Sequence, residues 1–139
     1  MIAYNRPFDD PLAGMNRKEG EVLFDIIRLA KGGEVQLVSS AIIEVENAAN
    51  EITARKNFVD SVMNLADTYQ NLSDSIVQRA QAIGQEYQLQ PLDAVHLASA
   101  EAAQVDFFIT CDYTVLKHYW GTLHIVTPLQ YQQHYENHH

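Results

Sequence analysis

The chain has 139 residues, and nine Lys and Arg against eighteen Asp and Glu give it a formal net charge of −9 at pH 7. Its hydrophobic fraction of 47% excludes a wholly disordered chain. The single cysteine, Cys111, excludes an internal disulfide framework and a zinc site built from several thiolates. The acid excess also disfavours nucleic-acid binding through a broad basic surface, unless metal ions or a local patch offset the repulsion.

Neither the N-terminus nor the longest uncharged stretch predicts a membrane or export signal. Residues 1–8 lack the basic and apolar regions of a signal peptide. The stretch from His118 to Tyr135 is free of Asp, Glu, Lys and Arg, but its histidines, glutamines and Pro128 make it too polar to span a bilayer. We therefore expect one domain over residues 1–139, located in the cytoplasm.

The first half of the chain alternates helical and extended patterns. Apolar residues recur at helical spacing from Asn16 to Lys31, and the glycine pair that follows predicts the end of that helix. Residues 35–38 predict a short buried strand, after which Ser39-Ser40 serves as the N-cap of a helix from residue 42 to about 50. A further helix is predicted from residue 54 to about 66.

Three elements follow in the middle of the chain. Residues 68–72 predict a short edge strand, and Ser73 is placed to cap a helix that reaches Tyr87. Pro91 suits the first turn of the next helix, whose many alanines allow close packing against a sheet or another helix.

The last elements complete an α/β pattern. Residues 106–111 are the strongest predicted strand, and a short helix through Val115 and Leu116 follows. Residues 123–126 predict a final strand, which Thr127-Pro128 ends. Strands that alternate with helices predict a parallel sheet covered by helices on both faces.

Polar residues follow the predicted strands at the edge where α/β proteins bind ligands. Ser40 and Glu46 follow the strand at 35–38, and Asp112 follows the strand at 106–111. Asp93 begins the alanine-rich helix and shares a helix face with His96. Carboxylates that converge in such a crevice repel one another unless a cation joins them, and oxygen ligands suit Mg²⁺ or Mn²⁺.

Each of these residues also has a purely structural interpretation. Asp93 and Asp112 suit helix N-termini, and Glu46 suits a solvated helix face. His96 suits a packed histidine and Ser40 a helix cap. The pattern alone therefore leaves both interpretations open.

Two segments in the second half of the chain resemble a PIN domain. Residues 91–100 read Pro-Leu-Asp-Ala-Val-His-Leu-Ala-Ser-Ala, and residues 105–112 read Val-Asp-Phe-Phe-Ile-Thr-Cys-Asp. Residues 37–40 with Glu46-Asn47 resemble the second strand, serine and acid of this family, and residues 4–10 resemble a segment of one bacterial subgroup. The resemblance covers nearly the whole chain.

The resemblance implies a Rossmann-like parallel sheet and a metal-dependent ribonuclease. Many bacterial PIN domains are VapC-like toxins that an antitoxin holds inactive, and members of the family commonly form dimers. By position, the acids that match the Mg²⁺ or Mn²⁺ ligands and catalytic residues of the family are Glu46, Asp93 and Asp112. The residues with matching supporting roles are Ser40, Thr110 and His96. The implied partners are an RNA substrate, an antitoxin and a second copy of the chain.

The sequence departs from the family pattern at its start. PIN domains begin with a strand that ends in aspartate, and no such residue precedes Asn5 here. Asp9 and Asp10 lie in a predicted turn and do not match the position. Three explanations stay open: a start upstream of Met1, a shortened first strand at residues 1–4 without the acid, or a strand supplied by another copy.

Three functions are therefore compared. The leading hypothesis is a metal-dependent PIN-type endoribonuclease, the toxin of a toxin–antitoxin pair. The alternative is a PIN-like binding or assembly module with impaired catalysis. A response-regulator-like or nucleotide-binding domain has less support, because the chain has no phosphate-binding loop and no acid pair after a first strand.

Overall fold

The computed structural model describes residues 17–138 and shows helices that alternate with short parallel strands. In chain order the elements are α1 (Arg17–Lys31), β1 (Val38–Ser40), α2 (Ala41–Ala48), α3 (Thr53–Met63), β2 (Thr68–Gln70), α4 (Asp74–Glu86), α5 (Pro91–Ala103), β3 (Phe108–Ile109), α6 (Tyr113–His118), β4 (Ile125–Val126) and α7 (Pro128–His138). This alternation confirms the predicted α/β class. No helix among these residues is both long and apolar enough to cross a membrane.

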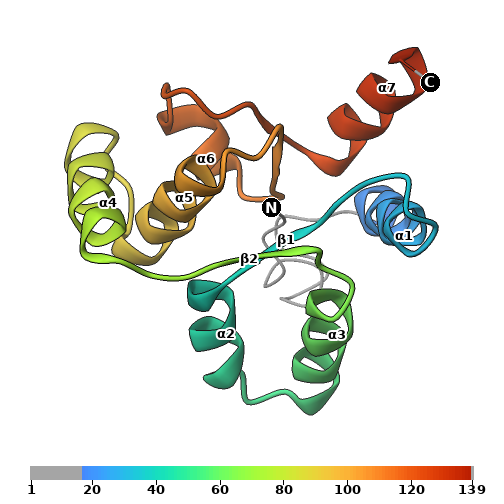
Figure 1. Cartoon of the computed structure of the whole chain (residues 1–139). Helices are drawn as coiled ribbons and strands as arrows, with labels where there is room; N and C mark the ends of the chain where they lie inside the picture. The colour runs from blue at the N-terminus through green and yellow to red at the C-terminus, as the bar shows by residue number, and fades with distance from the viewer. Residues whose placement is uncertain (1–16, 139) are drawn as a thin grey trace.

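Within residues 17–138 the strands form two separate parallel pairs. β1 pairs with β2, with Val38 opposite Thr68, and β3 pairs with β4, with Phe108 opposite Ile125. Figure 1 shows β1 and β2 crossing the middle of the molecule, with α2 and α3 on one side of them and α4, α5 and α6 on the other. The shortened first strand predicted at residues 1–4 lies outside the described residues.

The strand predicted at residues 35–38 is wrong in its boundaries. The observed strand β1 starts at Val38, because pairing with β2 begins there, and it continues through Ser39 and Ser40. Both serines are buried, so tertiary pairing extends the strand through residues that the sequence predicted only as a helix cap. Ser40 ends β1 and caps α2, since its Oγ accepts a hydrogen bond from the N–H of Ile43 at 3.3 Å.

The other three predicted strands are also shorter than expected, and of residues 68–72 only Thr68–Gln70 form a strand. Of residues 106–111 only Phe108–Ile109 form a strand, and of residues 123–126 only Ile125–Val126. Hydrogen bonds from the Phe108 N–H to the His124 carbonyl and from the Thr110 N–H to the Val126 carbonyl, both 2.9 Å long, flank this two-residue ladder. The apolar runs therefore predict burial correctly. They do not predict strand length, because each strand extends only as far as its partner strand pairs with it.

The C-terminal helix α7 is absent from the sequence prediction, which placed only a strand end at Thr127-Pro128. The missed signal is a capping box. The Gln130 N–H donates to the Thr127 hydroxyl at 3.1 Å, and the Gln130 side-chain oxygen accepts from the Thr127 N–H at 2.9 Å. Pro128 then occupies the first helical position, where its missing N–H costs no hydrogen bond.

The remaining helix predictions hold to within three residues at each end. Ser73 caps α4, because its Oγ accepts from the N–H of Ile76 at 3.2 Å, and Pro91 opens α5. The end of α1 also follows the prediction: Gly33 adopts a φ of 78°, a conformation that favours glycine.

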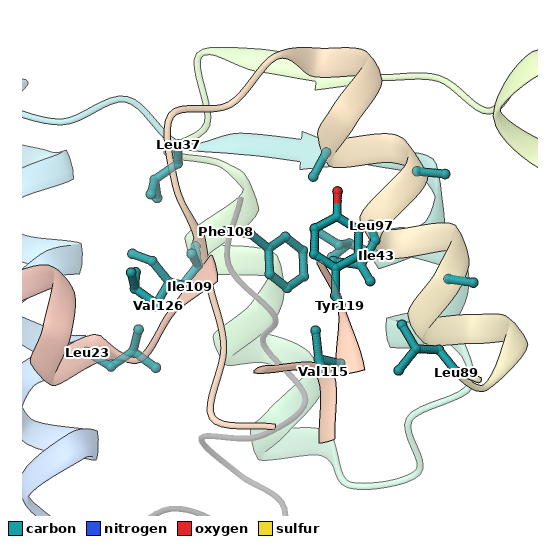
Figure 2. Packing of buried hydrophobic residues seen from close by; sticks show 14 of the residues in the cluster. Leu23, Leu37, Ile43, Leu89, Leu97, Phe108, Ile109, Val115, Tyr119 and Val126 are labelled. Carbon is teal, nitrogen blue, oxygen red and sulfur yellow. The ribbon is translucent and has the colours of Figure 1, made fainter. Parts of the chain in front are cut away.

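One hydrophobic core joins these elements, and α5 lies within it. Figure 2 shows side chains from α1, α2, α5, β3, α6 and β4 gathered in this cluster, together with Leu37 just before β1. Leu97 of α5 is fully buried. α4 and α5 pack closely at Gly84, where a Cβ would be in van der Waals contact with the Cβ of Ala94, at 3.7 Å. Each large apolar side chain buried in this way stabilises the fold by about 1.5–3 kcal/mol.

A polar network ties α4 and α5 to the turn that follows α6. Arg79 donates two hydrogen bonds to the Glu101 carboxylate, of 2.7 and 3.2 Å, and the Tyr119 hydroxyl donates a third of 2.5 Å. The pKa of Tyr119 is raised to about 12, chiefly by burial and next by the hydrogen bond to Glu101. Burial also raises the pKa of Glu101, but the bonds from Arg79 and Tyr119 outweigh it and lower the pKa on balance.

Candidate active site

The structure joins two of the predicted site residues directly. Glu46 of α2 and His96 of α5 are fifty positions apart in the sequence, and their Oε2 and Nε2 atoms lie 2.9 Å apart. His96 is buried, and its Nδ1 has no hydrogen-bond partner among the residues that the structure describes. An Nε2 proton donated to Glu46 gives the ring its one hydrogen bond and holds the carboxylate against α5.

Asp93 lies on the same part of α5. It is half-buried in the first turn of the helix, three residues before His96, so the two side chains share a helix face. An acid in the first turn is also favoured by the helix dipole. The position of Asp93 is therefore consistent with both interpretations, a stabilised helix N-terminus and a site residue.

Asp112 lies between β3 and α6 and caps the helix. Its Oδ1 accepts a hydrogen bond from the Thr114 N–H at 2.9 Å. The buried Thr110 supports this turn, because its hydroxyl accepts from the Asp112 N–H at 3.0 Å. Thr110 thus supports the backbone of Asp112, a physical reason for a Ser or Thr two residues before the acid.

Ser40 has a structural role in the described contacts. Its side chain is fully buried and its hydroxyl caps α2, the helix that carries Glu46. The cap sets where α2 begins, and the position of Glu46 follows from it. Ser40 therefore acts on the site through the helix.

The three acids do not form a closed metal centre in the described part of the chain. Among residues 17–138, no three His, Cys, Asp or Glu side chains gather closely enough to hold a metal ion. The metal-ligand roles of Glu46, Asp93 and Asp112 stay predictions. Of the predicted site residues, the structure joins Glu46 to His96 and Asp112 to Thr110 by hydrogen bonds.

The sequence analysis did not identify a role for Asn47, the residue after Glu46. Its Nδ2 donates to Asp60 Oδ1 at 2.9 Å and to the Lys56 carbonyl at 3.3 Å, which holds α2 against α3. Asn47 lines a hollow of about 630 Å³ between α2, α3 and β2. The residue type alone carries no signal for this role, because its partners lie on another helix.

The comparisons with known proteins agree with the fold. The helices alternate with parallel strands, so the fold is of the α/β class. The candidate site is acidic. A family model for the PIN domain matches residues 15–120, and the chain belongs to the PIN domain family.

A solved structure shares this fold. It is described as a toxin–antitoxin complex from Klebsiella pneumoniae, and the similar chain in it is 22% identical, with a TM-score of 0.59. The alignment covers 91% of this chain and 95% of that one. No curated protein matches the sequence.

Proposed function

We propose that the protein is an endoribonuclease that cleaves RNA with the help of Mg²⁺ or Mn²⁺, and that Glu46, Asp93 and Asp112 are its acids. Membership of the PIN family supports this proposal. The observation that carries it is the 2.9 Å hydrogen bond between Glu46 and His96, which holds one acid against the helix that bears Asp93. The α7 helix lies beyond the residues matched by the family model and packs against α1, and we propose that it belongs to the same domain.

The chemistry of the donor set suits the ion, but the described side chains do not complete a site for it. Carboxylate oxygens are the ligands that Mg²⁺ and Mn²⁺ prefer. Such an ion, when bound, activates water and offsets charge on a phosphate. The role of this chain is to orient its acids: His96 holds Glu46, and Thr110 holds the turn at Asp112. Because no three ligands gather among residues 17–138, ion binding itself is the decisive measurement.

The test combines calorimetric titration with Mn²⁺ and cleavage of single-stranded RNA. The wild-type chain should bind Mn²⁺ and cleave, and Asp93→Asn should lose cleavage by about 100-fold or more, as for removal of a group that acts on the transition state. Asp106→Asn is the matched control, since Asp106 is exposed at the start of the β3 segment and outside the proposed site. Equal loss in both variants would contradict the assignment of Asp93.

A PIN-like module without catalysis is the second candidate. It is favoured by the lack of a three-ligand group among the described residues. The same titration separates the two functions. A well-folded chain with no affinity for Mn²⁺ and no cleavage would support the module and refute the nuclease.

We further propose that the nuclease is the toxin of a toxin–antitoxin pair. The resemblance to VapC-like proteins supports this, and a structure with the same fold is described as a toxin–antitoxin complex. Induced expression should arrest bacterial growth, and the Asp93→Asn variant should not. Normal growth despite abundant soluble wild-type protein would contradict the toxin assignment.

A further inference from the structure

Two aromatic side chains project into solvent at either end of α6. Trp120 is 83% exposed and Tyr113 is 50% exposed, whereas most large apolar side chains of the chain lie in the core. Trp120 is the only tryptophan of the sequence. A tryptophan this exposed forgoes much of the free energy that burial of its ring would supply, which points to a role in binding.

The exposed residues of α6 include one pair that shares a helix face. Tyr113 and Lys117 are four residues apart and therefore share a helix face, and His118 is exposed beside them. Val115, on the opposite face, is 3% exposed and packs into the core. We call the four residues Tyr113, Lys117, His118 and Trp120 the α6 strip.

The α6 strip carries one lysine and no acidic residue. Lys117 is the only Lys or Arg after Arg79, and no Asp or Glu occurs between Asp112 and Glu136. In a chain with a net charge of −9, this acid-free segment is one that a phosphate backbone can approach. It also starts immediately after Asp112, one of the three proposed acids.

The turn that presents Trp120 is firmly held. The preceding residue, Tyr119, is buried, and its hydroxyl donates to Glu101 at 2.5 Å and accepts from the Leu123 N–H at 3.3 Å. A Cβ at the following residue, Gly121, would collide with the Tyr119 ring, so the turn requires glycine there. Trp120 is therefore fixed outward between two constrained neighbours, which lowers the entropy lost on binding.

We propose that the α6 strip binds single-stranded RNA: Tyr113 and Trp120 stack on bases, and Lys117 contacts a phosphate. Aromatic rings interleaved with basic residues are the means by which proteins bind single strands without reading sequence. The strip combines two aromatic rings with a lysine and carries no acid, and this combination favours a single strand as its occupant. The proposal rests on the ribonuclease function and adds the surface that brings RNA to Asp112.

The test measures RNA binding without cleavage. A labelled single-stranded oligoribonucleotide is titrated with the protein in EDTA and followed by anisotropy, while quenching of the sole tryptophan reports contact at Trp120. Tyr113→Ala and Trp120→Ala should each weaken binding about tenfold, and Tyr113→Phe should restore it, because stacking needs only the ring. Lys117→Ala should reduce the slope of log affinity against log salt by about 0.7, the loss of one phosphate contact.

Two matched controls lie outside the α6 strip. Tyr69→Ala removes a tyrosine of similar exposure, 44%, whose hydroxyl donates to Glu44, and Lys31→Ala removes an exposed lysine at the end of α1. Both should bind RNA as the wild type does. If the Tyr113, Lys117 and Trp120 variants also bind RNA like the wild type, the proposal is wrong.

The binding assay also separates this proposal from the nuclease. RNA binding that depends on the α6 strip, in a chain that does not cleave with Mn²⁺, would support the strip and refute the nuclease. Cleavage with a KM unchanged in Tyr113→Ala and Trp120→Ala would support the nuclease and refute the strip.

Discussion

Replacement of Glu101 by glutamine tests whether the Arg79–Glu101–Tyr119 network holds the second half of the fold together. The substitution keeps the volume of the side chain and removes its charge. Arg79 then faces a neutral amide instead of a carboxylate that accepts two of its hydrogen bonds. The buried Tyr119 hydroxyl loses the carboxylate oxygen to which it donates at 2.5 Å.

The expected loss of stability is about 2–3 kcal/mol. A hydrogen bond to a charged group contributes about 1.5–3 kcal/mol, and the Tyr119–Glu101 bond is of this kind. The Arg79–Glu101 pair adds less, because the Arg79 side chain is 41% exposed and water screens it. A loss of this size lowers the melting temperature by about 6–9 °C in a chain of this length.

Urea unfolding followed by circular dichroism measures the change. Asp25→Asn is the control, since it breaks the exposed Asp25–Arg28 pair within α1 and should cost about 0.5 kcal/mol or less. Trp120 fluorescence gives a local readout, because Tyr119 anchors the turn that carries it. A free energy of unfolding within 0.5 kcal/mol of wild type for Glu101→Gln would refute the reasoning.

Three further predictions follow from the core, the last helix and the tyrosine. Leu97→Ala should destabilise the fold by about 2–5 kcal/mol through the cavity it leaves, measured by urea unfolding, and a cost below 1 kcal/mol would contradict full burial. Thr127→Ala should cost about 0.5–2 kcal/mol and reduce helicity, because it removes half of the α7 capping box; unchanged helicity in circular dichroism would argue against that cap. Because folding raises the pKa of Tyr119 to about 12, its stabilisation is complete below pH 10 and is lost as the pH rises toward 12. Urea midpoints across that range should fall less steeply in Tyr119→Phe than in wild type.

The local elements were largely predictable because their signals are local. Ser73 and Pro91 mark helix starts through their own chemistry, and the apolar spacing around Leu23 identifies the buried face of α1. The capping box at Thr127 and Gln130 was equally local and could have been read from the sequence. It was missed because Pro128 was interpreted as the end of a strand and not as the first residue of a helix.

The strand boundaries were not predictable in the same way. An apolar run indicates burial, but a strand ends where its partner ends, and the partner of Phe108 lies at Ile125. The prediction was therefore too long at residues 106–111 and displaced at residues 35–38. The two separate strand pairs are a property of the described fold that no local pattern indicates.

Some features of the candidate site were likewise predictable from the sequence, and others were not. The sequence alone predicted an acidic site with Glu46, Asp93 and Asp112 as its acids, and it showed the likeness to PIN domains, because motif and spacing are written in the chain. Tertiary structure alone decided that His96 binds Glu46, that Thr110 supports Asp112, and that Trp120 is held outward. The Glu46–His96 contact and the fixed turn at Trp120 depend on helices that are distant in the sequence and packed in space, which is why composition and periodicity could not reveal them.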